Sequence, residues 1–207
     1  MIEAVIFDVD GTLWDSSETV TKAWNLVFAR RNLPPCEIGQ IRDCMGLTLD
    51  EIGARFFPEL SSAARSEILA ECMECQRGIL KEEGGRLYPG VRETLSALCL
   101  KYALYIVSNC ECGYIENLLS FCGLEPYFRG FLCAGMTGKK KGENLLLLKE
   151  KYALGSCVYV GDTHTDELAC RQAGIPFIFA AYGFGKAESP AARVGSFAEI
   201  AGEADKL

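Results

Sequence analysis

A chain of 207 residues with 49% hydrophobic residues has enough apolar side chains to bury the core of one large domain or two small ones. Its net charge of −7 argues against nucleic-acid or anionic-membrane partners, because both need a basic surface. No apolar run is long enough to span a membrane, and no signal-like segment opens the chain. We therefore expect a cytoplasmic protein whose eleven cysteines are reduced.

Short apolar runs alternate with helical patterns along most of the chain. Strands are expected at 4–9, 102–109, 131–135, 157–162 and 176–183. Helices are expected at 89–102, 142–154 and 163–174. The strands are almost continuously hydrophobic, which indicates that both faces of their sheet are covered. This alternation predicts an α/β fold with a doubly wound, parallel, Rossmann-like core.

The interval between the first two predicted strands is far longer than the dozen or so residues that a crossover connection needs. Residues 18–31 and 62–83 have helical patterns, and residues 48–51 have the spacing of a capping box. We therefore expect a helical insert at 15–86. The α/β core is then formed by 1–14 and 87–207.

Polar residues gather where the predicted strands end. They are Asp8 and Asp10 after the first strand, Ser108 and Asn109 after the second, Lys141 after the third, and Asp162 with Asp166 after the fourth. Because ligands of such sheets bind outside the carboxyl ends of the strands, we expect these side chains to form one site. Oxygen ligands of this kind suit a hard divalent cation, and Mg²⁺ fits best because it binds through one or two carboxylates and a phosphate.

A carboxylate at this site can act as a nucleophile toward phosphorus. Two unit charges 4 Å apart repel by about 4 kcal/mol at an effective dielectric near 20, so a carboxylate cannot approach a phosphate dianion unaided. Mg²⁺, the ammonium of Lys141, and donors from Ser108 and the backbone around Gly11 would offset that repulsion. Asp8 is then able to form an aspartyl phosphate, while Asp10 transfers protons. Residues i and i+2 of an extended strand point the same way, so we expect both acids at one centre.

Four segments together resemble the haloacid dehalogenase superfamily of phosphohydrolases over essentially the whole chain. They are DVDGT at 8–12, YIVSN at 105–109, KKKGEN at 139–144 and VGDTHTD at 160–166. The third segment departs from the Lys-Pro that many members carry. Its Lys-x-Glu-x-Leu pattern is similar to that of phosphoglycolate-phosphatase-like members, which favours Lys141 and leaves Lys139 as the alternative.

The resemblance implies a role for each matching residue. Asp8 is the implied nucleophile, Asp10 the general acid/base, and Ser108 the phosphate-binding hydroxyl, with Lys141 completing the catalytic set. The implied metal ligands, for Mg²⁺, are Asp8, Asp10, Asp162 and Asp166, the last either binding the metal or supporting its ligands. We expect Gly11, Thr12 and Asn109 to contact the substrate.

The resemblance also identifies the helical insert as a cap domain that closes over the site and selects the substrate. It implies a Mg²⁺-dependent phosphatase of small phosphorylated metabolites, in the phosphoglycolate-phosphatase-like branch. A sugar phosphomutase of the same superfamily and a non-catalytic binding protein on the same fold stay open as alternatives. The sequence leaves the substrate, the oligomeric state and the role of the cysteines open.

Overall fold

The computed structural model describes residues 2–207 and confirms the predicted α/β fold class. Six parallel strands form one sheet in the order β5-β4-β1-β6-β7-β8. Their bounds are β1 Ala4–Phe7, β4 Ala103–Ser108, β5 Phe128–Cys133, β6 Cys157–Gly161, β7 Phe177–Ala180 and β8 Ala192–Val194. The strand β1 lies at the centre, where the order of the chain reverses, and this is where doubly wound folds bind ligands.

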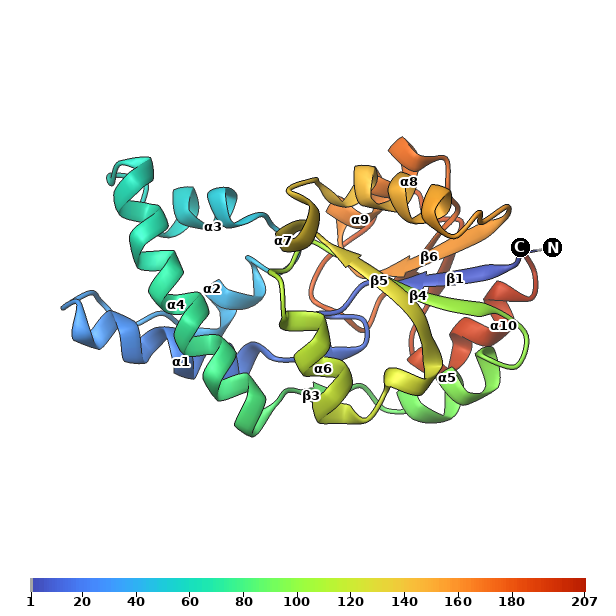
Figure 1. Ribbon diagram of the computed structural model, residues 1–207, viewed down its shortest axis with the longest axis horizontal. Coiled ribbons are helices and arrows are strands. Elements are labelled where there is room, and N and C mark those ends of the chain that lie inside the picture. Colours follow the sequence, from blue (N-terminus) through green and yellow to red (C-terminus); the bar gives the residue numbers. More distant parts are fainter. Residues whose placement is uncertain (1) are drawn as a thin grey trace.

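Helices cover both faces of the sheet (Figure 1). On one face lie α5 (Val91–Leu98), α6 (Tyr114–Cys122) and α10 (Ile200–Ala204), and on the other lie α8 (Lys141–Lys151) and α9 (His164–Ala173). Alternate residues of β1 serve the two faces, because Val5 and Phe7 pack into one buried cluster and Ala4 and Ile6 into the other. Short helical turns complete the core at α7 (Ala134–Thr137), η1 (Glu125–Tyr127) and η2 (Phe197–Glu199).

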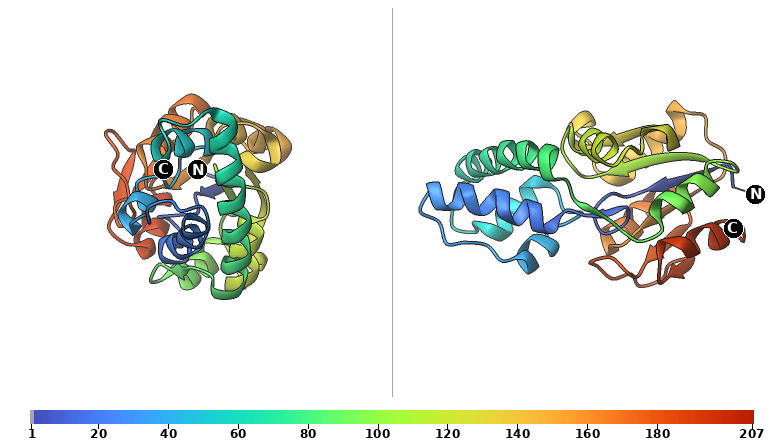
Figure 2. Two further views of the ribbon diagram at one scale, coloured as in Figure 1. Left: turned by 90° about the vertical axis from the view of Figure 1, so that its left-hand side faces the viewer. Right: turned by 90° about the horizontal axis from the view of Figure 1, so that it is seen from below.

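The residues between β1 and β4 form a second group of helices beyond the carboxyl ends of the strands (Figures 1 and 2). These helices are α1 (Ser17–Arg30), α2 (Ile38–Arg42), α3 (Leu49–Phe56) and α4 (Ser62–Glu83). The indole N–H of Trp24 on α1 donates to Oε1 of Gln76 on α4 at 3.0 Å, which fixes the two long helices to each other. The sequence pattern had indicated both helices correctly.

A two-stranded antiparallel ribbon marks where the chain leaves the α/β core and returns to it. Its strands are β2 (Trp14–Asp15) and β3 (Arg86–Leu87), with Trp14 opposite Leu87 and Asp15 opposite Arg86. We propose the division into a core of residues 1–14 and 87–207 and a cap of residues 15–86 on this basis.

The sequence pattern did not predict α6 or β8. The strand β8 has three residues at the sheet edge, too few for an apolar alternation to stand out. The strand β5 begins at Phe128 rather than at residue 131, because the exposed Arg129 and the half-buried Gly130 interrupt its apolar run. Within residues 2–207, no helix is long and apolar enough to cross a membrane.

Candidate active site

Three carboxylates meet at the carboxyl ends of β1 and β6. Asp8 follows β1, Asp162 follows β6, and Asp166 lies in the first turn of α9. One oxygen from each lies within 4.8 Å of the others, and all three side chains are buried. The two strands are neighbours in register, with Phe7 opposite Val160, so the parallel ladder itself brings Asp8 and Asp162 together.

The ammonium of Lys141, the first residue of α8, lies inside this cluster. Its Nζ is 3.0 Å from Oδ1 of Asp8 and 2.5 Å from Oδ1 of Asp166, and the side chain is fully buried. Burial lowers the pKa of the lysine, but the charges of Asp166 and Asp8 outweigh it and hold that pKa above its usual range. Lys139, the alternative from the sequence, is exposed and lies 3.7 Å from Glu143, outside the cluster.

Asp166 and Asp162 are held by hydrogen bonds from the surrounding loops. Asp166 accepts from Nζ of Lys141, the backbone N–H of Asp162, and the hydroxyls of Thr163 and Tyr159. Asp162 accepts from the backbone N–H of Phe184 at 2.7 Å, and the hydroxyl of Thr12 is 3.5 Å away. Asp166 therefore serves to orient Lys141 and the loop after β6.

Asp8 is less well satisfied than its neighbours. Its Oδ1 lies 3.0 Å from Nζ of Lys141, yet among residues 2–207 it has no hydrogen-bond partner. Burial raises the pKa of Asp8 to about 7, with the charge of Asp166 adding to the shift and that of Lys141 opposing it. Burial likewise raises the pKa of Asp162 well above its usual range.

These observations fit a bound divalent cation. Three buried carboxylates face one ammonium, so the cluster carries an uncompensated negative charge that burial makes costly. The donors are hard oxygens, and the unsatisfied Oδ1 of Asp8 is one of them. Mg²⁺ prefers such ligands, so Asp8 and Asp162, with Asp166 beside them, would hold it.

Gly11 packs its backbone directly against Asp162. Its φ of +77° lies in the left-handed region, and a Cβ at this position would come within 2.1 Å of Oδ2 of Asp162. The turn after β1 therefore requires glycine for two reasons, its conformation and the closeness of the carboxylate. The prediction that Gly11 contacts the substrate stays a prediction.

Asp10 lies apart from the three clustered carboxylates. Its Oδ1 accepts from Nε1 of Trp14 at 3.1 Å, Oγ of Ser16 at 2.7 Å and the hydroxyl of Tyr114 at 2.8 Å. Burial raises the pKa of Asp10 to about 6, and these three hydrogen bonds oppose the shift. The strand β1 ends at Phe7, so the spacing of an extended strand does not apply to Asp10, and the chain turns it toward Trp14.

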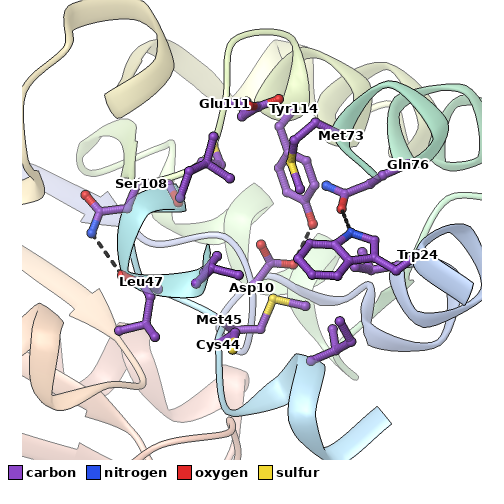
Figure 3. Close-up of a pocket in the computed structure, with 17 residues that line it drawn as sticks. Asp10, Trp24, Cys44, Met45, Leu47, Met73, Gln76, Ser108, Glu111 and Tyr114 are labelled. Carbon is purple, nitrogen blue, oxygen red and sulfur yellow. Dashed lines mark hydrogen bonds between the residues drawn. The ribbon is translucent and has the colours of Figure 1, made fainter. Parts of the chain in front are cut away.

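A cavity of about 90 Å³ lies between the helices of residues 17–83 and the α/β core (Figure 3). Asp10, Ser108 and Asn109 line it from the core side. Residues that sequence reasoning missed complete it, among them Trp24, Cys44, Met45, Leu47, Met73, Gln76 and Tyr114. Nδ2 of Asn109 donates to the carbonyl of Gly46 at 2.9 Å, so this predicted substrate contact joins the core to the cap.

Some residues around Asp10 and the cavity could have been identified from the sequence, and others could not. Trp14 and Ser16 lie within six residues of Asp10, and polar groups so close to a predicted catalytic acid were a usable signal. Tyr114 is 104 positions away, on a helix that the pattern did not predict. Only the fold brings its hydroxyl to Asp10.

Comparison with known proteins supports the resemblance to the haloacid dehalogenase superfamily. A family model described as haloacid dehalogenase-like hydrolase matches residues 5–180. The phosphoglycolate phosphatase of Xanthomonas campestris pv. campestris is 29% identical over 186 residues, which cover 87% of this chain and 84% of that protein. The phosphoglycolate phosphatase of Xylella fastidiosa is 29% identical over 185 residues, covering 87% and 80%.

Solved structures share the fold. A predicted phosphoglycolate phosphatase from Haemophilus somnus superposes with a TM-score of 0.87 at 24% identity, covering 97% of both chains. A haloacid dehalogenase-like hydrolase from Streptococcus pneumoniae gives a TM-score of 0.86 at 23% identity, again covering 97% of both. The predicted family is confirmed: the chain belongs to the haloacid dehalogenase-like hydrolases and is an enzyme of their phosphatase branch.

Proposed function

We propose that the protein is a Mg²⁺-dependent phosphatase of small phosphate monoesters, with Asp8 as nucleophile and Asp10 as general acid/base. The observation that carries the proposal is the ion-paired cluster of Asp8, Lys141, Asp162 and Asp166, buried beside a separately hydrogen-bonded Asp10. Asp8 is thus kept next to the positive charge of Lys141, while Asp10 is held by three uncharged hydrogen-bond donors. These are the environments that a nucleophile and a proton-transferring group need.

Asp8 attacks phosphorus through one oxygen of its carboxylate, while the other, Oδ1, faces Lys141 and would hold the metal. The new bond forms between the attacking oxygen and phosphorus, and the bond from phosphorus to the ester oxygen breaks. Lys141 stabilises the charge on Asp8 before the attack and on the phosphoryl oxygens afterwards. A bound Mg²⁺ would supply further positive charge for the same oxygens.

Asp10 donates its proton to the leaving ester oxygen and later accepts one from the water that hydrolyses the aspartyl phosphate. Its pKa of about 6 suits both steps near neutral pH. The hydroxyls of Ser16 and Tyr114 and the indole of Trp14 all bind Oδ1, so Oδ2 is the atom that moves the proton. Positioned proton transfer of this kind typically contributes about 10² to 10⁴ in rate.

Ser108 and Asn109 line the cavity next to Asp10, where they are placed to bind the phosphoryl group. Thr12 points its hydroxyl toward Asp162 instead, so we assign it to the support of that carboxylate. We also propose a cytoplasmic location, which the absence of any disulfide among the eleven cysteines of residues 2–207 supports.

The test is the hydrolysis of an aryl phosphate by Asp8→Asn and by the unchanged enzyme after metal chelation. We expect both to lose activity by more than about 10³-fold while the circular dichroism spectrum stays native. Product analysis with sugar phosphates then separates hydrolysis from isomerisation. Full activity of either sample, or an isomerised sugar phosphate as the main product, contradicts the proposal.

A further inference from the structure

The residues that line the cavity between the cap and the core indicate which kind of leaving group fits there. Within residues 2–207, no lysine or arginine lines this cavity, whereas Asp10 and Glu111 both do. The remaining wall is mainly apolar and sulfur-containing, with Met45, Cys44 and Met73 among its residues (Figure 3). Because Asp10 is protonated when it serves as the acid, a leaving group with its own carboxylate would lie near the charge of Glu111 and meet no cation in the lining.

The guanidinium of Arg77 is already neutralised by acidic neighbours. Arg77 lines an adjoining open groove that also contains Glu111. Its NH1 lies 2.6 Å from Glu74 and its NH2 lies 3.7 Å from Glu111, so two carboxylates share one cation. Partial burial raises the pKa of Glu111, and the charge of Arg77 opposes that shift. The groove therefore offers a carboxylate ligand no net attraction.

The cap contributes one polar donor to the cavity, the amide of Gln76. Its Oε1 is occupied by the indole N–H of Trp24 at 3.0 Å, which orients the amide and leaves the nitrogen to donate. Figure 3 shows this nitrogen on the side of Gln76 away from Trp24. Within residues 2–207 the hydrogen bond of this amide is the one that Oε1 accepts from Trp24. A ligand therefore meets a donor rather than a charge.

The volume adds a limit on size. A cavity of about 90 Å³ is well below the roughly 300 to 1,000 Å³ of pockets for drug-sized ligands. With the cap as it lies, only a few heavy atoms of a leaving group fit inside this cavity, and a longer one would extend into the adjoining groove.

We infer that this enzyme acts on phosphate esters whose leaving group has no carboxylate and is able to accept a hydrogen bond from Gln76, and that it discriminates against carboxylate-bearing esters such as 2-phosphoglycolate. The inference rests on the proposed phosphatase function and narrows its substrate class. It predicts a substrate for this chain that differs from the phosphoglycolate in the names of its relatives. The cause is the electrostatic cost of placing a carboxylate beside Glu111 in a cavity whose lining holds no lysine or arginine.

The test compares three esters of similar size that differ in charge. These are 2-phosphoglycolate, the phosphate ester of glycolamide, and 2-aminoethyl phosphate, with an aryl phosphate as a reference for phosphatase activity. We expect kcat/KM for the glycolamide ester to exceed that for 2-phosphoglycolate by at least about tenfold, as one nearby unpaired charge produces in a partly screened site, whereas 2-aminoethyl phosphate, whose ammonium Glu111 does not repel, should not show this loss. Equal values for the glycolamide ester and 2-phosphoglycolate, or a preference for 2-phosphoglycolate, overturn the inference while leaving the phosphatase intact.

Two variants show whether the proposed side chains cause the preference. Glu111→Gln is expected to raise kcat/KM for 2-phosphoglycolate at least about threefold relative to the glycolamide ester. The matched control is Glu116→Gln, an equal change of charge on an exposed residue of α6 that does not line the cavity. Gln76→Met is expected to lower kcat/KM for the glycolamide ester more than for ethyl phosphate, which lacks the acceptor. An unchanged ratio in both variants contradicts the inference.

The outcomes distinguish a failure of the proposed phosphatase function from a failure of the inference about the substrate. If no ester is hydrolysed, the aryl phosphate included, the phosphatase function fails and the inference falls with it. If the aryl phosphate is hydrolysed and 2-phosphoglycolate is the best of the three esters, only the inference is wrong.

Discussion

Gly11→Ala tests whether the turn after β1 brings backbone against the carboxylate of Asp162, the proposed metal ligand. The new Cβ would lie 2.1 Å from Oδ2 of Asp162, about 0.9 Å short of the 3.0 Å below which such contacts essentially never occur. Either Asp162 or the turn must move by roughly this amount. Displacements of about 1 Å at a catalytic centre cost on the order of 10²-fold in rate, and we expect a loss of that size in kcat.

The substitution also has a conformational cost that must be measured apart from the effect on the site. A non-glycine residue in the left-handed region costs about 1 to 2 kcal/mol, and the φ of Gly11 is +77°. Gly174→Ala is the matched control, because Gly174 has a φ of +65° and an added Cβ there would meet no atom within 4 Å. Urea unfolding gives the loss of stability for both variants. Calorimetric titration with Mg²⁺ and steady-state kinetics then report on the site.

We expect Gly174→Ala to lose stability alone, whereas Gly11→Ala also loses Mg²⁺ affinity and activity. Normal Mg²⁺ affinity and normal kcat in Gly11→Ala would refute the reasoning, since Asp162 would then have room for the side chain. Equal losses of activity in the two variants would refute it as well, because backbone strain would then explain both.

Three further outcomes follow from the buried contacts. Lys141→Met leaves the carboxylates of Asp8 and Asp166 without their cation, so we expect the free energy of unfolding in metal-free buffer to fall by about 3 kcal/mol; a fall below about 1 kcal/mol in urea denaturation contradicts this. Trp24→Phe removes the hydrogen bond to Oε1 of Gln76, and we expect a loss of about 1 kcal/mol in the same assay, with unchanged stability as the contrary result. Mg²⁺ at 100 times its dissociation constant should raise the free energy of unfolding by about 2.7 kcal/mol and raise the melting temperature. Asp8→Ala should lose most of this gain, and an equal gain in that variant would place the metal elsewhere.

The α/β core was predictable because its strands are short apolar runs bounded by polar residues. The runs that contain Val5 and Val158 carry hydrophobic residues toward both faces of the sheet, a pattern that few other structures give. The helix α6 was missed because it begins directly after the glycine Gly113, in a segment whose Ser108-to-Gly113 stretch reads as loop. Local pattern does not reveal how long such a loop is.

The clustered residues of the candidate site were predictable for a related reason. Asp8 and Asp162 end neighbouring parallel strands, so a correct sheet order brings them together without any knowledge of side-chain geometry. The surroundings of Asp10 and the cavity were not predictable, because they depend on how the cap packs on the core. The contact of Asn109 with Gly46 crosses that boundary and joins residues 63 positions apart.

The most direct test of the central claim is to trap the phosphoryl group on Asp8. The enzyme is mixed with an aryl phosphate and Mg²⁺, quenched in the steady state, and treated with borohydride, which reduces an acyl phosphate to the alcohol. Mass spectrometry of the peptide that contains residues 5–16 then identifies the residue that was reduced. We predict homoserine at position 8 only when substrate and metal are both present, and none in Asp8→Asn. Reduction at Asp10 or Asp162 instead, or no reduced peptide during active turnover, would contradict the account.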